Sequence, residues 1–211
     1  MYLRSATSYW TLQTPLLHTY NALDRDCNCD VAVIGGDISG ELAAYALVNA
    51  GCKVMLVTKG HVAMGSTAAS TSLLQYEIDT PLYKLIEKVG RQKAEAAYLL
   101  CHQSIDELEK IHRHIGMAKI FERRKSLQLA STKKDIPALE LEFLLRQNLG
   151  IELELLSPAD VKHRFGFTAP GALYAVQAAQ TNSYLFTQEL IHWCHKHGAA
   201  VHDKTVIKNI Q

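Results

Sequence analysis

The residue types best suited to chemistry lie in a glycine-rich turn, Val33–Gly40, between a short apolar run and a helical pattern. Gly35 permits a tight turn there, and Gly40 lets the following helix pack closely against the preceding strand. Free N–H groups at the start of the helix, together with its dipole, attract a diphosphate. The turn is therefore predicted to bind a dinucleotide through Gly35, Gly36, Asp37, Ile38, Ser39 and Gly40.

Two positions depart from the usual pattern of a dinucleotide-binding turn. Asp37 stands where that pattern has its middle glycine, so a carboxylate lies where the backbone should approach the phosphates. At about 4 Å and an effective dielectric constant near 20, two unit charges repel by about 4 kcal/mol. After the next apolar run, Thr58 and Lys59 replace the acid that usually binds the ribose hydroxyls. These departures predict a weakened site, and Lys59 is also consistent with selection of a 2′-phosphate.

A second group of polar residues follows the turn at Gly65–Thr71, with the sequence GSTAAST. Its hydroxyls and backbone N–H groups suit an anion at a helix start, and its alanines keep the approach open. A plain N-capping loop is the alternative interpretation, but the position shortly after the glycine turn favours a binding role. The residues predicted to take part are Gly65, Ser66, Thr67, Ala68, Ala69 and Ser70.

A β-α-β unit is needed to position these residues, and the surrounding sequence predicts one. Residues 30–34 and 53–58 are short, β-branched apolar runs typical of buried parallel strands. Residues 38–50 predict the helix between them, and Gly51 closes it. The crossover between the strands is expected to be right-handed. The apolar spacing predicts a buried helix face made of Leu42, Ala43, Ala46 and Leu47.

The rest of the chain predicts a second kind of architecture. Residues 1–29 are expected to be an irregular arm, and Thr80-Pro81 is expected to be an N-cap with proline in the first helical position. Alternating strand and helix patterns in the middle region favour a mixed or antiparallel sheet with covering helices. The expected helices are 91–115, 135–149, 184–197 and a short one after Ser157; the expected strands are 126–130, 151–155, 171–179, 200–202 and 205–207, with 122–125 as a solvated turn.

Composition limits the function further. The chain has 211 residues, 48% of them hydrophobic, and a formal net charge of +1, so a folded globular protein is expected and nucleic acid is an unfavourable partner. No run of about 18 apolar residues and no signal-like N-terminus is present, which predicts a cytoplasmic protein without a membrane span. The odd number of cysteines, 5, favours free thiols, and the histidine spacing predicts no metal site.

Four stretches together resemble a known family: Tyr9–Asp26, residues 31–57 around the glycine turn, residues 65–86 and residues 172–203. They are similar to bacterial FAD-dependent oxidoreductases of the D-amino-acid oxidase and glycine oxidase superfamily. The resemblance implies an α/β fold, in which a Rossmann-like FAD-binding domain is joined to a partial α+β substrate domain. The implied boundaries are 1–117 for the arm and FAD-binding domain with a helical insertion, 118–180 for the partial substrate domain, and 181–211 for the return to the FAD-binding domain.

The resemblance also implies FAD as the cofactor and a small-molecule amine or amino acid as the substrate, which is oxidised by hydride transfer to the flavin. No catalytic residue is assigned. Family members continue beyond the length of this chain, so a fragment of a longer protein is expected. In this family Gly35, Gly36 and Gly40 would surround the pyrophosphate, Thr58 and Lys59 would lie near the adenosine ribose, and Ser66, Thr67, Ala69 and Ser70 would line the path to the flavin.

Two other functions stay open at this point. Asp37 and Thr58 are consistent with a non-catalytic remnant of the fold, or an interaction module, that binds FAD weakly or not at all. Lys59 is consistent with an NADP-dependent reductase.

Overall fold

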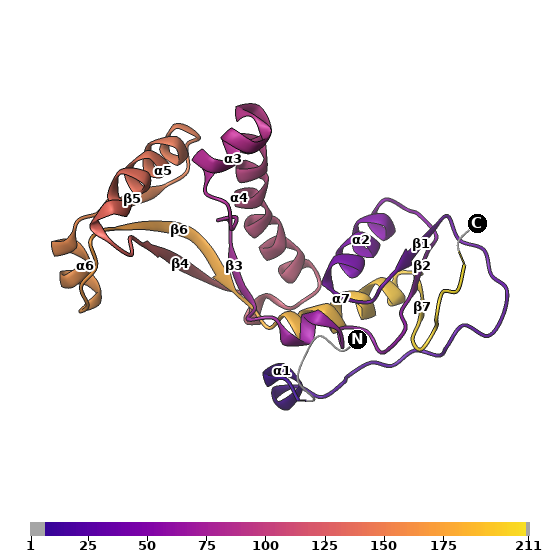
Figure 1. Ribbon diagram of the computed structural model, residues 1–211. Coiled ribbons are helices and arrows are strands. Elements are labelled where there is room, and N and C mark those ends of the chain that lie inside the picture. The colour runs from indigo at the N-terminus through magenta and orange to yellow at the C-terminus, as the bar shows by residue number, and fades with distance from the viewer. Residues whose placement is uncertain (1–6, 210–211) are drawn as a thin grey trace. The chain divides into compact units, whose positions relative to one another are not determined.

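The computed structural model describes residues 7–209, which form two compact units (Figure 1). The first unit contains the residues up to Ser72, His112–Ile120 and the residues from Thr181 onward. The second contains Leu73–Ile111 and Phe121–Gln180. Each unit has its own sheet and its own buried core.

The first unit is built on a parallel three-stranded sheet. Its helices and strands are α1 (Tyr9–Gln13), β1 (Val31–Ile34), α2 (Ile38–Asn49), β2 (Val54–Val57), the 3₁₀ helices η1 (Ser66–Ala69) and η2 (Ala118–Ile120), α7 (Ser183–Lys196) and β7 (Ala200–His202). The strand order is β1-β2-β7, and Val33 lies opposite Leu56, which lies opposite Val201. The predicted β-α-β unit is confirmed, and so is the return of the strand at 200–202 to the first sheet.

Two local predictions for this unit are wrong. Residues 205–207 form no strand, because Lys204 has a positive φ of 49° that interrupts the extended backbone and the sheet pairing stops at His202. The arm also contains the short helix α1, although residues 1–29 were expected to be irregular; residues 1–6 lie outside the described part of the chain.

The buried face of α2 differs from the predicted one. Ala43 and Ala46 are exposed, whereas Glu41 and Ala44 are completely buried. Most sides of α2 are apolar, so the spacing of its hydrophobic residues does not identify the buried face. Acidic residues are rarely fully buried, so Glu41 was not expected in the core. The helix α2 packs against α7 and the sheet (Figure 1). The residues buried in this core are Val33, Ala44, Val54, Leu56, Val62, Ile191, Cys194, Ala199 and Val201.

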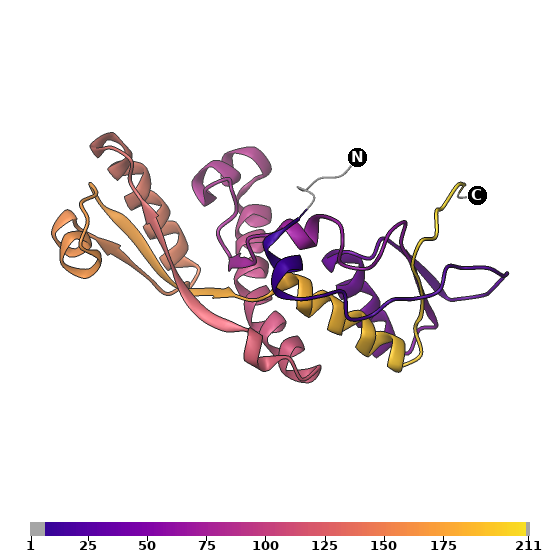
Figure 2. The same cartoon turned by 90° about the horizontal axis from the view of Figure 1, so that it is seen from below.

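The arm between α1 and β1 follows α7 and then the last strand (Figure 2). Leu17 N–H donates to the Gln188 side chain at 2.7 Å, and the His18 ring bonds to Glu189 at 3.0 Å. Farther along, Leu23 N–H donates to the Thr205 hydroxyl at 3.0 Å. The arm is therefore held by side chains that come from the C-terminal part of the chain.

The second unit is built on an antiparallel sheet, which agrees with the predicted mixed or antiparallel sheet. Its central strand β6 pairs with β3, β4 and β5. Residues 122–125 belong to β4 and not to a turn; their side chains are exposed, so they carry no hydrophobic alternation. The elements are β3 (Leu73–Gln75), α3 (Leu82–Val89), α4 (Arg91–His114, which runs on into the first unit), β4 (Glu122–Leu129), the 3₁₀ helix η3 (Lys133–Asp135), α5 (Ile136–Asn148), β5 (Leu153–Leu156), α6 (Pro158–Phe165) and β6 (Ala172–Gln180).

The start of α3 is capped by a side chain that is distant in sequence. The N-cap residue is Pro81, one residue later than predicted, and α3 begins at Leu82. The Glu142 carboxylate accepts hydrogen bonds from the N–H groups of Leu82 at 2.8 Å and Tyr83 at 3.2 Å. This tertiary contact supplies the cap that Thr80 was expected to supply.

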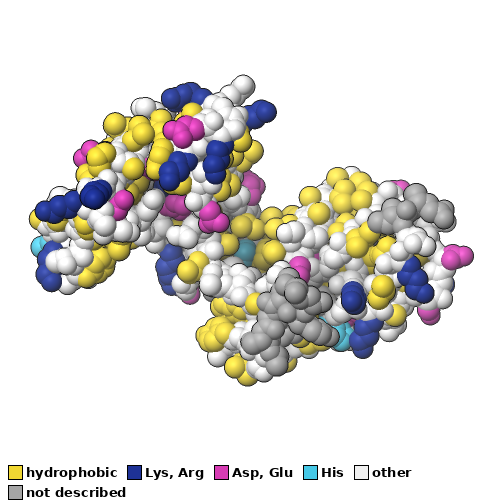
Figure 3. Space-filling view, in the orientation of Figure 1, with side chains coloured by type: hydrophobic (Ala, Val, Ile, Leu, Met, Phe, Trp, Pro, Cys, Tyr) yellow, Lys and Arg dark blue, Asp and Glu magenta, His cyan; other side chains and the backbone are white. Residues whose placement is uncertain are grey.

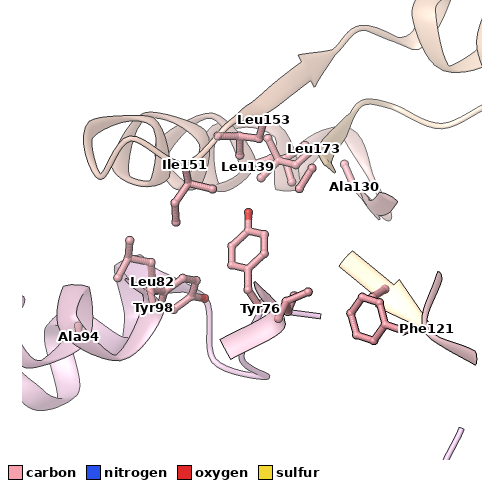
Figure 4. Close-up of a cluster of buried hydrophobic side chains, with 13 residues drawn as sticks. Tyr76, Leu82, Ala94, Tyr98, Phe121, Ala130, Leu139, Ile151, Leu153 and Leu173 are labelled. Carbon is pink, nitrogen blue, oxygen red and sulfur yellow. The ribbon is translucent and has the colours of Figure 1, made fainter. Parts of the chain in front are cut away.

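A buried ion pair holds this cap in place. Arg146, which is 2% exposed, donates to Glu142 at 2.6 Å, and its guanidinium lies over the rings of Tyr76 and Tyr98. Figure 4 shows Tyr76 and Tyr98 among the apolar side chains of the same core. The ionic groups are thus enclosed by aromatic rings and paired with each other, which offsets their desolvation. The other labelled members of this core are Leu82, Ala94, Phe121, Ala130, Leu139, Ile151, Leu153 and Leu173.

The surface of the second unit mixes both signs of charge on the face drawn in Figure 3. This mixture agrees with the net charge of +1 over the whole chain. Among the described residues, the helices are too short or too polar to cross a membrane.

Replacing Arg146 by methionine is expected to lower the free energy of unfolding by about 3–5 kcal/mol, because Glu142 is then left buried without its partner. Urea denaturation measures the change. Replacing both residues by methionine should recover part of the loss, since the buried charge of Glu142 is removed as well. The recovery is only partial because Glu142 also caps the start of α3. The matched control is Arg91→Met, which removes an exposed pair with Glu95 and should change stability little. Equal losses in the two single variants would contradict the role assigned to the buried pair.

Candidate functional site

The glycine turn between β1 and α2 has a backbone shape that only small residues allow. Gly35 has a positive φ of 113°, and its N–H donates to the Val57 carbonyl at 2.9 Å, which links the turn to β2. A Cβ atom on Gly40 would lie 2.1 Å from the Gly35 carbonyl oxygen. The helix therefore approaches the end of β1 so closely that residue 40 has no room for a side chain.

Space is left on one side of this turn. A Cβ atom on Gly35 would meet no atom within 4 Å, whereas one on Gly36 would lie 3.1 Å from the Thr58 side chain. The turn lies at the carboxyl ends of two neighbouring parallel strands, where ligands of open α/β sheets bind, and at the positive end of the α2 dipole. The backbone here has the features of a turn that binds an anionic group.

The Asp37 side chain leaves the turn and contacts the second predicted group. Asp37 is the N-cap residue of α2, but its carboxylate makes no cap hydrogen bond to that helix. Instead it accepts hydrogen bonds from Gly65 N–H at 3.2 Å, Ser66 N–H at 3.1 Å and the Ser66 hydroxyl at 3.4 Å. The structure thus brings the two predicted groups of residues together through the residue that departs from the usual pattern.

Thr67 makes the reciprocal connection. Its hydroxyl accepts a hydrogen bond from Ile38 N–H at 3.1 Å, and the residue is only 3% exposed. Ala63 N–H also donates to the Gly36 carbonyl at 2.6 Å. The segment 61–67 is therefore hydrogen-bonded to the turn at Gly36, Asp37 and Ile38. The Thr67 hydroxyl accepts from one of the N–H groups at the start of α2 that have no partner within the helix.

The other residues of the second group have varied positions. Ala68 is buried against Ala63 and Tyr184, so it serves packing. Ala69 and Ser70 are exposed, and the Ser70 carbonyl accepts the hydrogen bond of the Trp10 indole N–H at 2.7 Å. Of the residues predicted from the second group, Gly65, Ser66 and Thr67 thus lie at the glycine turn.

Thr58 and Lys59 follow directly after β2. The Thr58 side chain packs next to Gly36, and its N–H donates to the His202 carbonyl at 3.0 Å. Lys59 is exposed, as is Ser39 in the first turn of α2. The ends of β1 and β2 therefore present Gly36 and Thr58 side by side, with Lys59 at the surface.

Two buried acids close to this site were not predicted from the sequence. Asp203 is fully buried and accepts hydrogen bonds from Tyr20 N–H at 3.2 Å, Val62 N–H at 3.2 Å and the His61 ring at 2.7 Å. It joins the arm, the segment after β2 and the end of β7. Its position directly after the predicted strand 200–202 was the only available signal.

Glu41 is the second buried acid, and its environment is different. It is fully buried one turn into α2, and among the described residues neither of its carboxylate oxygens has a hydrogen-bond partner. Burial raises the pKa of Glu41 well above its usual value, and the nearby carboxylates of Asp37 and Asp203 raise it further. Burial in the same region also raises the pKa of the Cys194 thiol to about 12. The α2 core therefore favours a protonated, neutral Glu41.

No group of three or more potential metal ligands is present among the described residues.

Comparisons with known proteins agree with this geometry. The family model DAO, described as FAD dependent oxidoreductase, matches residues 30–211. A protein of Bacillus subtilis (strain 168) named as a Rieske 2Fe-2S iron-sulfur protein, YhfW, is 26% identical over 205 residues, which are 97% of this chain and 39% of that protein. The chain thus spans well under half of this relative.

Two solved structures have a similar fold. Glycine oxidase from Bacillus cereus ATCC 14579 has a TM-score of 0.67 and 20% identity, with 87% of this chain and 48% of that chain covered. L-amino acid deaminase from Proteus myxofaciens, in complex with anthranilate, has a TM-score of 0.74 and 15% identity, with 92% of this chain and 42% of that chain covered. The chain therefore spans less than half the length of both proteins.

Replacing Gly40 by alanine is expected to destabilise the first unit by about 2 kcal/mol or more, because the new methyl group overlaps the Gly35 carbonyl and forces α2 away from β1. Thermal and urea denaturation measure this loss. Gly60→Ala is the control, since a Cβ atom there meets nothing within 4 Å. Similar stability of the two variants would mean that the close approach at Gly40 is not required.

Replacing Glu41 by glutamine is expected to change how stability depends on pH. With a raised folded-state pKa, the acid's contribution is complete below its ordinary pKa of 4.5 and is lost as the pH rises towards the folded-state pKa. The variant should therefore gain stability relative to the wild type as the pH rises from about 4.5. Denaturation curves over a pH series test this, with exposed Glu87→Gln as the control. Parallel curves for wild type and Glu41→Gln would contradict a raised pKa.

Proposed function

The chain belongs to the family of FAD-dependent oxidoreductases whose model matches residues 30–211, and on this premise we propose that its first unit binds FAD. The proposed activity of the whole protein is oxidation of amines or amino acids, with hydride transfer to the flavin. Because the chain spans less than half the length of its structural neighbours, this activity is a proposal for the whole protein to which these residues belong.

One observation supports the proposal most strongly. The turn that joins β1 to α2 combines a positive φ at Gly35, open space beside that residue and a helix start that approaches within contact of the strand at Gly40. This combination lets the backbone and the helix dipole face a diphosphate without a side chain from residue 35 or 40 between them.

The proposed roles of the residues follow from their positions. Gly36, Ser39 and Gly40 would hold the diphosphate through the backbone at the start of α2. Gly35 and Ile38 would shape the turn, since their N–H groups bond to Val57 and Thr67. Thr58 and Lys59, at the carboxyl end of β2, would lie near the adenosine ribose. Gly65, Ser66, Thr67, Ala68, Ala69 and Ser70 would form the second wall of the site, where Thr67 fastens that wall to α2 through Ile38.

FAD supplies the electron acceptor for the oxidation when it is bound. The described residues of this chain contribute binding and orientation: the glycine turn fixes the diphosphate, and the segment 61–67 fixes the position of the wall beside it. No described side chain is proposed to move a proton from the substrate.

A second candidate is favoured by the Asp37 contact. Its carboxylate takes the hydrogen bonds of Gly65 and Ser66, which is consistent with a chain that binds FAD weakly or not at all. The exposed Lys59 similarly keeps an NADP-dependent reductase among the alternatives. The binding experiment below distinguishes the three.

Incubation with FAD is expected to raise the melting temperature of the chain, because a ligand that binds only the folded state stabilises it. At 100 times the dissociation constant the gain is about 2.7 kcal/mol. ADP should compete with FAD, since the proposed contacts are to the diphosphate and adenosine. Quenching of flavin fluorescence provides an independent measure of binding.

Two results would contradict the proposal. Protection by NADPH and none by FAD would favour the reductase. Absence of protection by either nucleotide, at concentrations up to the solubility limit, would favour a remnant without cofactor.

A further inference from the structure

The side chain of Asp37 is held by three donors of one neighbouring segment. Its Oδ1 accepts from Gly65 N–H, and its Oδ2 accepts from both the N–H and the hydroxyl of Ser66, at 3.1 to 3.4 Å. Two adjacent backbone N–H groups and a hydroxyl form the donor set that commonly binds a phosphate oxygen in proteins. The carboxylate thus makes the contacts that an anionic ligand would make.

Residue 65 is matched to this contact. A Cβ atom on Gly65 would lie 2.1 Å from the Asp37 Oδ2, so any other residue at this position would push the carboxylate away. The carboxylate therefore occupies a place that is open only because residue 65 is glycine.

The segment is held in place without the help of Asp37. The hydroxyl of Thr67 accepts from Ile38 N–H at 3.1 Å, and Ala63 N–H donates to the Gly36 carbonyl at 2.6 Å. Asp37 is only half-buried, so its side chain can rotate towards solvent while these two contacts persist. The donors of Gly65 and Ser66 would then become free without rearrangement of the backbone.

We propose that the Asp37 carboxylate is an internal substitute for a phosphate of the cofactor. It occupies the Gly65 and Ser66 donors and must turn away before FAD binds. This inference rests on the proposed function of the first unit. It assigns to Asp37 the role of lowering the affinity for FAD in two ways: the carboxylate competes for the donors, and its charge repels the diphosphate at short range. The Asp37 side chain thereby limits the affinity for FAD at a turn whose backbone is otherwise suited to binding a diphosphate.

The test compares FAD binding by the wild type, Asp37→Asn and Asp37→Ser. Asparagine keeps the size of the side chain and removes its charge, and serine keeps a hydroxyl suited to a helix N-cap. Both variants are expected to bind FAD at least about tenfold more tightly than the wild type in isothermal titration calorimetry. Their difference from the wild type should shrink at high salt, since the repulsion is electrostatic. Asp24→Asn is the matched control, because it removes an exposed acid of the same unit that pairs with Arg25, and it should leave the affinity unchanged.

A second measurement follows the contact itself in the absence of FAD. The amide signals of Gly65 and Ser66 should move in the NMR spectrum of Asp37→Asn and exchange their hydrogens faster than in the wild type, whereas Asp24→Asn should leave them unchanged. If the Gly65 and Ser66 amides are the same in the wild type and both Asp37 variants, the internal contact is absent and the inference is overturned.

The outcomes separate this inference from the proposed function. Equal FAD affinity in the wild type and both Asp37 variants would overturn the inference and leave the proposed function standing. Failure of every variant to bind FAD would overturn the proposed function and the inference that rests on it. Tighter binding in both Asp37 variants, together with altered Gly65 and Ser66 amides, would support both.

Discussion

The contact on which the first unit depends most is the approach of α2 to the end of β1. Gly40 lies so close to the Gly35 carbonyl that a single methyl group would overlap it. This approach directs the start of α2 at the carboxyl edge of the sheet and aligns β1 with β2 through the Gly35 to Val57 hydrogen bond. The glycine turn, the helix dipole and the binding surface are consequences of the same short distance.

Negative charge accumulates around this turn in an unusual way. Asp37, Glu41 and Asp203 lie close enough for the two aspartates to raise the pKa of Glu41. Each acid is accommodated differently: Asp203 by three hydrogen bonds, Asp37 by the amides of the neighbouring segment, and Glu41 by the neutral form. A site proposed to bind a dianionic group thus has acidic residues beside it, and the Asp37 carboxylate is the one that bonds to predicted site residues.

The second unit also contains buried charges, and these form an ion pair. Glu142 caps the start of α3, and it is paired with Arg146, whose guanidinium lies over the rings of Tyr76 and Tyr98. The start of α3 at Leu82 is therefore capped by residues of α5, which lie much farther along the sequence. Such a cap ties α3 to α5 and adds specificity to the packing of the core, although a buried ion pair contributes little net stability compared with apolar residues of similar size.

The sequence by itself determined the order of strand, glycine turn, helix and strand at residues 31–57, because alternation, helical spacing and glycine act over a few neighbouring residues. It also identified Asp37 as an obstacle to anion binding. Only the tertiary structure decided where that carboxylate goes, namely to the amides of residues 28 and 29 positions farther along the chain. The same holds for the burial of Glu41 and for the cap that Glu142 gives to α3. Contacts between distant segments depend on how whole helices and strands pack together. The residues that make such contacts have no periodic pattern in the sequence from which the contact could be predicted.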